Sequence, residues 1–118
     1  MTLKLKLSKP IFMKNQIEHN QKESVDLLRF LQKSAHHLKP VVQIGKNGIN
    51  ESVIKEINEA LLAHELIKIK FLPSQKLYMQ SLSEEIIQST VSKLVKMQGN
   101  IITIFLAKKK NSNYLKGF

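Results

Sequence analysis

The sequence predicts a single α/β domain in which a small mixed sheet packs with helices, in the element order α-β-α-β-α-β-β. Three observations predict this class. The length of 118 residues is that of one ordinary domain, and an apolar share of 42% suffices for one core. Stretches with a helical apolar period alternate with short strand-like runs. The last two strand-like runs flank a Gly-Asn pair, which indicates a hairpin.

The first predicted helix begins near Ser24, whose side chain can cap its N-terminus. Apolar residues then recur near the helical period and would form its buried side: Leu27, Leu28, Leu31, Ala35 and Leu38. Pro40 cannot continue a helix, because it lacks an amide hydrogen. The apolar run from Val41 to Ile44 that follows predicts a short buried strand.

A turn over Gly45 to Gly48 comes next, and Asn50 is placed to cap a second helix over about Glu51 to His64. One side of this helix is apolar, with Val53, Ile54, Ile57, Ala60 and Leu61. Another side is charged, with Glu51, Lys55, Glu56 and Glu59. The run from Leu66 to Leu72 alternates apolar residues with lysines, which predicts a half-exposed strand.

A third helix is predicted from Pro73 to about Ser89, although a capping box at Ser81 and Glu84 would also allow a later start. Its candidate core residues are Met79, Leu82, Ile86 and Ile87. The last two predicted strands form a hairpin with a two-residue turn. The hairpin consists of Lys93 to Gln98, the pair Gly99-Asn100, and Ile101 to Ala107.

The flanking segments differ in composition from this domain. Residues 1–23 predict a flexible extension, residues 24–107 the domain, and residues 108–118 a basic tail. The start lacks the unbroken apolar block of a secretory signal, and Met13 would also serve as a start codon. The chain has no cysteine and no apolar run of about 18 to 20 residues. We therefore expect a cytoplasmic protein without a membrane partner.

Positive charge is the strongest global signal. Nineteen Lys and Arg against nine Asp and Glu give a formal net charge of +10. The surplus lies toward the two ends of the chain, because residues 41–107 hold seven basic and six acidic side chains. This balance favours an anionic polymer as partner. A lysine-rich composition that serves solubility alone is the alternative.

The Gly45-Lys46-Asn47-Gly48 tetrad lies between a predicted strand and a helix N-terminus. Amides of a first helical turn lack internal partners and the helix dipole is positive there, so an anion is favoured. The two glycines remove Cβ atoms that would block a close approach. Lys46 adds a charge and Asn47 adds donors, which predicts a clamp for a phosphodiester. A turn that needs glycine only for its shape is the simpler alternative.

Two longer motifs resemble the CRM domain family (chloroplast RNA splicing and ribosome maturation). The first is LKPVVQIGKNGI at residues 38–49, and the second is ALLAHELIKIK at residues 60–70. The resemblance is to the free-standing bacterial YhbY type and covers about Ser24 to Ala107 without a gap. It implies an α/β sheet fold similar to the C-terminal domain of translation initiation factor three.

The resemblance also implies RNA binding, with precursors of the large ribosomal subunit as the RNA. It assigns the Gly45–Gly48 loop to the RNA contact. The outward acids of the second helix would repel phosphates. We therefore expect the RNA to meet the tip of this helix and to turn toward Arg29, Lys33 and Lys39 on and after the first helix.

Aromatic and ionisable residues exclude several other functions. Phe71 and Phe105 are the only aromatic residues in predicted strands, and both are expected in the core, so backbone recognition is favoured over base stacking. His36 and His64 lack the partners that a metal site requires. No nucleophile–base pair or carboxylate cluster is present, which argues against a hydrolase or nuclease. We expect no enzyme activity, no cofactor and no small-molecule substrate.

Two questions stay open at this level. Lys68 and Lys70 could contact RNA only if no helix covers their side of the sheet. A rival function is that of an interaction adaptor that docks on ribosomal or translation proteins, with its basic ends serving solubility. In either case we expect a monomer.

Overall fold

The computed structural model describes residues 25–108 and 111–115. Residues 25–34 are helical and continue into a 3-10 turn, η1. The remaining elements follow in the predicted order. They are η1 (Ala35–His37), β1 (Pro40–Ile44), α2 (Glu51–His64), β2 (Leu66–Phe71), η2 (Pro73–Tyr78), α3 (Met79–Thr90), β3 (Lys93–Gln98) and β4 (Ile101–Phe105). Ser24, the extension over residues 1–23 and part of the basic tail lie outside the described residues.

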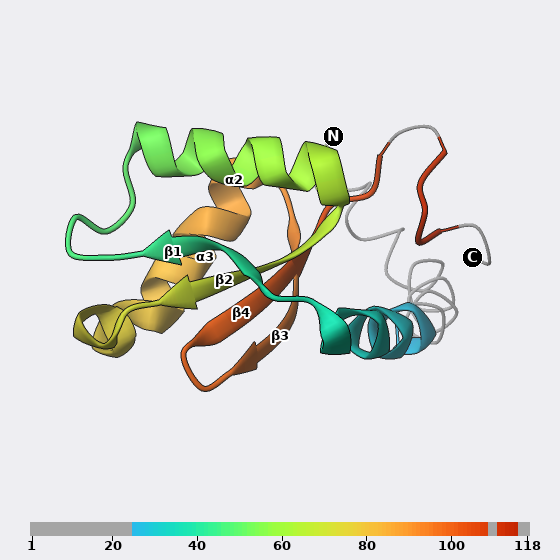
Figure 1. The fold of residues 1–118 in the computed structure, drawn as a ribbon, viewed down its shortest axis with the longest axis horizontal. Coiled ribbons are helices and arrows are strands. Elements are labelled where there is room, and N and C mark those ends of the chain that lie inside the picture. The colour runs from blue at the N-terminus through green and yellow to red at the C-terminus, as the bar shows by residue number, and fades with distance from the viewer. Residues whose placement is uncertain (1–24, 109–110, 116–118) are drawn as a thin grey trace, which may run out of the picture.

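The four strands form one mixed sheet in the order β1-β2-β4-β3. β1 pairs with β2 in parallel, whereas β4 pairs antiparallel with both β2 and β3. The β1–α2–β2 segment is therefore a parallel crossover unit, and β3 and β4 are the predicted hairpin. Figure 1 shows α2 and α3 on one side of this sheet, and the first helix beside the end of the sheet that lies away from the β1–α2 loop. The predicted α/β class is confirmed.

The main core lies between the sheet and the helices α2 and α3. Because successive side chains of a strand point to opposite faces of the sheet, every second residue of these strands points toward the two helices. The buried residues of this cluster are Val42, Ile44, Ile57, Leu61, Ile67, Ile69, Phe71, Met79, Ile86, Ile102 and Ile104. Leu82 and Ile87 pack against it, so all four core residues predicted for the third helix belong to this core.

A second, smaller core joins the first helix to the opposite face of the sheet. Leu31 and Ala35 are buried there against the three sheet residues Leu66, Val95 and Phe105. Gln32 ties the helix to β3, because its Nε2 donates to the carbonyl oxygen of Val95 at 3.1 Å. This helix covers one end of the face. Farther along the strands, Lys68 and Lys70 are only partly buried on the same face.

Two elements differ from the prediction. β1 is half-exposed rather than buried, because it is an edge strand: Val41 is 48% exposed and Gln43 faces solvent. The predicted third helix begins with the six-residue 3-10 segment η2, and the α-helix starts at Met79. None of the residues in η2 is buried, so the core does not impose α-helical packing on that segment.

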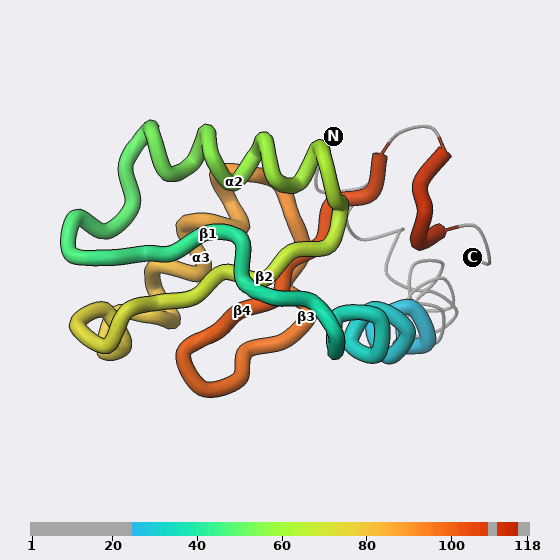
Figure 2. Tube along the Cα trace, viewed as in Figure 1, coloured from blue at the N-terminus to red at the C-terminus, as the bar shows by residue number. Residues whose placement is uncertain are grey.

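The trace is elongated, with the β1–α2 loop at one end and the first helix at the other (Figure 2). Residues 111–115 lie beside the first helix at that second end (Figure 2). Tyr114 fixes them there, because its ring makes edge contacts with Phe30 and Phe105 at centroid distances of 6.4 and 5.8 Å.

Candidate nucleic-acid interface

The Gly45–Gly48 loop is a tight turn at the carboxyl end of β1. The amide of Gly48 donates to the carbonyl oxygen of Gly45 at 2.9 Å, which closes the turn around Lys46 and Asn47. Gly48 has a φ of +64°, a backbone conformation that favours glycine. Lys46 and Asn47 are therefore held at the tip of the turn, where both are exposed.

The base of this loop is packed against the end of β2. The amide of Leu72 donates to the carbonyl oxygen of Ile44 at 2.9 Å and extends the strand pairing to the edge of the loop. A Cβ atom added at Gly45 would lie 3.2 Å from Leu72 Cδ1. A side chain at position 45 would therefore need Leu72 to shift by a few tenths of an ångström, and the backbone angle at Gly48 favours glycine.

The expectation of free helical amides is wrong in part. Asn50 caps α2 as predicted, and its Oδ1 accepts a hydrogen bond from the amide of Val53 at 2.9 Å. The amide of Gly48 is also occupied, by the turn itself. Among the described residues, the loop amides of Lys46, Asn47 and Ile49 donate to no other group. A bound anion would therefore meet the tip of the loop rather than a complete ring of helical amides.

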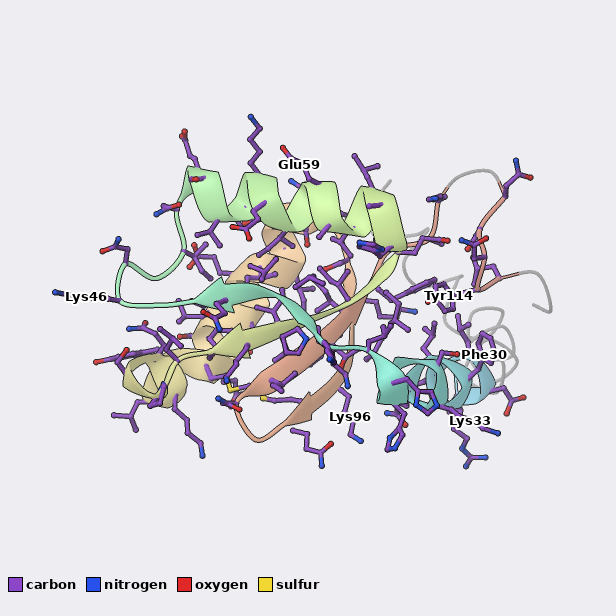
Figure 3. The ribbon with its side chains drawn as sticks, in the orientation of Figure 1. Phe30, Lys33, Lys46, Glu59, Lys96 and Tyr114 are labelled. Atoms are coloured by element: carbon purple, nitrogen blue, oxygen red, sulfur yellow. The ribbon has the colours of Figure 1, made fainter. Side chains whose placement is uncertain are left out.

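The predicted basic residues outside the loop lie at the opposite end of the molecule. Arg29, Lys33 and Lys39 are all exposed, as expected. In Figure 3, Lys33 lies on the first helix and Lys46 projects from the far end. β1 connects the two regions, since Lys39 immediately precedes it and Gly45 immediately follows it; its five residues span roughly 15 Å. The two groups of cations could meet one ligand only if that ligand is extended.

The outer surface of α2 is acidic, as the sequence predicts. Glu51, Glu56 and Glu59 are exposed, and Glu59 points away from the sheet in Figure 3. A groove between α2 and α3 adds Glu85 to this side of the molecule. Because these carboxylates would repel phosphates, a surface that binds a polyanion should lie elsewhere on the molecule.

The open face of the sheet carries Lys68, which could contact RNA only if this face is uncovered, and Lys96, which was not among the predicted site residues. Both lysines line a depression on this face. The alternation in β2 predicts where Lys68 points. The position of Lys96 depends on a change of register between β3 and β4, which has no signal in the sequence.

The described part of the chain assembles no cluster of metal ligands. Within it, no three His, Cys, Asp or Glu side chains come together in a way that could hold a metal ion. His36, His37 and His64 are exposed. Among the same residues, no helix is long and apolar enough to cross a membrane.

The fold and the glycine-flanked loop together define a class: a small basic α/β domain with an exposed lysine-containing turn between a strand and a helix N-terminus. The description of the CRS1/YhbY (CRM) domain matches residues 24–105. The chain belongs to this family, as the two sequence motifs predicted.

Individual relatives agree with this assignment. The "Probable RNA-binding protein YqeI" of Bacillus subtilis is 41% identical over 83 residues, which are 70% of this chain and 86% of that protein. A Haemophilus influenzae protein named "RNA-binding protein" is 39% identical over 77 residues, which are 65% of this chain and 78% of its own. These relatives are named for RNA binding and not for catalysis, in agreement with the prediction that the chain is not an enzyme.

A solved structure shares the fold. The solution structure of a Staphylococcus aureus protein superposes with a TM-score of 0.64 at 38% sequence identity. The match covers 74% of this chain and 91% of the other.

Proposed function

We propose that this protein binds RNA by its sugar-phosphate backbone, with the Gly45–Gly48 loop as the principal contact. The observation that carries the proposal is the exposed Lys46-Asn47 tip, held between two glycines by a 2.9 Å hydrogen bond in the loop that precedes α2. Lys46 supplies a charge, while the amides and side chain of the tip supply donors to phosphate oxygens. The relatives that are named RNA-binding proteins support the same function.

The second contact in this proposal is the first helix, through Arg29, Lys33 and the following Lys39. These residues and the loop lie at the two ends of β1, so the ligand must be a polymer rather than a nucleotide. The acidic outer side of α2 directs the polymer away from that helix and toward the sheet and the first helix.

Backbone recognition rather than base stacking fits the aromatic residues. Phe71 is completely buried and Phe105 is 6% exposed, so neither offers a ring to a base from the sheet. Modules that read single-stranded RNA by stacking require such exposed rings. Binding should therefore be mostly electrostatic, with discrimination by RNA shape.

The kind of RNA that is bound is proposed from the resemblance to the YhbY type. On that ground we propose ribosomal precursor RNA during large-subunit assembly, bound in the cytoplasm by a monomer. Ultraviolet crosslinking in cells, followed by sequencing of the recovered RNA, tests this identity. Enrichment of large-subunit precursor sequences supports it, whereas recovery of messenger or transfer RNA alone would replace it.

Purified protein and protein-free RNA test the core of the proposal against the adaptor alternative. A fluorescently labelled precursor fragment should bind at about 150 mM salt, because the loop and first helix contact RNA directly. A protein that only docks on ribosomal or translation proteins would give no change in anisotropy, and that result would reject direct RNA binding.

A further inference from the structure

Two lysines flank a threonine in a row across the open face of the sheet. In the antiparallel register Lys68 of β2 is paired with Thr103 of β4, and Thr103 is paired with Lys96 of β3. Directly paired residues on adjacent strands point to the same face. Strands are spaced by about 4.8 Å, so the two lysine backbones lie roughly 10 Å apart with the threonine between them.

A β-bulge at Val95 places Lys96 in this row. Leu94 is paired with Ile104 and Lys96 with Thr103, so Val95 is the extra residue. Without the bulge, strict alternation would direct Lys96 to the face that packs on α2 and α3. Val95 is buried against the first helix, which anchors the bulge.

The row lies in a depression that contains cations and no carboxylate. Its volume is about 250 Å³, and its lining consists of Gln32, Ala35, His36, Lys68, Lys96, Gln98, Ile101 and Thr103. Thr103 is 3% exposed and forms the base, whereas Lys96 and His36 are exposed at the rim. The hydrogen bond from Gln32 to Val95 fixes the wall formed by the first helix.

This arrangement favours an anion between the two lysines. Like charges that face one depression repel each other, and the lining supplies no acid to offset the repulsion. A phosphate group between them would accept hydrogen bonds from both ammonium groups and from the threonine hydroxyl. The same chemistry would suit free phosphate or the phosphodiester of a nucleic acid.

We propose that the Lys68–Thr103–Lys96 row is a second phosphate site, which takes a backbone phosphodiester of the RNA whose binding is proposed above. The inference rests on that proposed function. The position supports the backbone source over free phosphate: in Figure 3, Lys96 lies between Lys46 at one end of the molecule and Lys33 at the other. An RNA chain that passes from the loop to the first helix would cross this face of the sheet.

The salt dependence of RNA affinity tests the lysines. Lys68→Gln and Lys96→Gln should each weaken binding about threefold to tenfold near 100 mM salt and lower the magnitude of the slope of log affinity against log salt by about 0.7 to 0.9. Lys55→Gln on the outer side of α2 is the matched control, because it removes the same charge from an exposed position outside the depression. It should leave the slope unchanged.

Thr103→Val tests the hydroxyl separately from charge. The two side chains have similar shapes, so the fold should be retained, which thermal unfolding checks. Loss of one hydrogen bond should weaken RNA binding roughly twofold to tenfold, with an unchanged salt slope. A structural effect of the substitution would instead lower the melting temperature and alter the loop contact as well.

Nuclear magnetic resonance separates the two ligand sources. A short RNA hairpin at micromolar concentration should shift the amide signals of Lys68, Thr103 and Lys96. Shifts with inorganic phosphate alone, and none with RNA, would reject the RNA version of the site. If wild-type protein binds RNA and the loop variants weaken it, yet Lys68→Gln and Lys96→Gln behave like Lys55→Gln, this inference fails and the proposed function stands. If wild-type protein does not bind RNA, both fail.

Discussion

The carboxylate of Glu65 accepts a hydrogen bond of 2.5 Å from the hydroxyl of Ser112, 47 residues later in the chain. Two backbone amides, those of Lys108 and Asn113, also donate to this carboxylate at 2.9 Å. Glu65 is completely buried and has a φ of +65°, which is unusual for a residue with a side chain. It ends α2, and it fastens the segment after β4 to the domain beside the first helix.

Replacing Glu65 by Gln should destabilise the fold. The amide is neutral and has one acceptor oxygen where the carboxylate has two, so all three donors lose a charged partner and at least one of them loses its acceptor. We expect the free energy of unfolding in urea to fall by about 1 to 3 kcal/mol. Glu56→Gln, on the exposed side of α2, is the control and should change it by less than about 0.5 kcal/mol. Equal stability of the two variants would show that the buried contact is not important to the fold.

The same carboxylate should make stability depend on pH. Burial raises the pKa of Glu65, but the hydrogen bonds from Ser112, Lys108 and Asn113, with the charge of Lys108, outweigh burial and hold the pKa below its usual value of 4.5. The stabilisation is therefore present above that value and is lost as pH falls through the lower pKa of the folded protein. Below pH 4.5 the stability difference between wild type and Glu65→Gln should shrink. A difference that stays constant from pH 7 to pH 3 would contradict the shift.

Gly48→Ala should affect both the fold and RNA binding. An added Cβ has no atom within 4 Å, but the φ of +64° strains any other residue, at a cost of about 1 to 2 kcal/mol. Gly99 in the β3–β4 turn is a matched control, because its φ is +61° and its added Cβ is equally free. Both variants should lose similar stability in thermal unfolding, whereas only Gly48→Ala should weaken RNA binding. Equal affinities would mean that the loop conformation does not matter for the ligand.

The first helix should contribute to the electrostatic part of binding. RNA affinity of the wild type should fall about tenfold or more between roughly 50 and 200 mM salt if several phosphates are neutralised. Arg29 and Lys33 are exposed one helical turn apart. Replacing both by Gln should lower the magnitude of the salt slope by about 1.4 to 1.8, as two phosphate contacts would require. An unchanged slope would remove the first helix from the interface.

Local patterns were sufficient to predict most of the fold. The apolar period of α2 and its cap at Asn50 predicted a helix whose bounds the structure reproduces, from Glu51 to His64. The Gly99-Asn100 turn likewise predicted the hairpin. The edge position of β1 could not be predicted, because strand order is set by packing between segments distant in the sequence. The 3-10 conformation of η2 also has no periodic signal, because none of its six residues is buried.

The candidate site was predicted less completely than the fold. The loop and the cations of the first helix followed from composition and motif, and they are exposed as expected. Lys96 did not follow, because one extra residue at Val95 changes the face of every later residue in β3. Glu65 was missed as well, since a buried carboxylate whose partners lie more than 40 residues away has no local pattern.

The affinity of a loop variant for protein-free RNA tests the central claim most directly. Lys46→Asp combined with Asn47→Asp replaces one positive charge by two negative charges at an exposed turn, where neither side chain makes a hydrogen bond within the described residues. Circular dichroism and thermal unfolding should therefore match those of the wild type. RNA affinity measured by fluorescence anisotropy at about 100 mM salt should fall at least tenfold. Affinity equal to that of the wild type would contradict a phosphate contact at this loop.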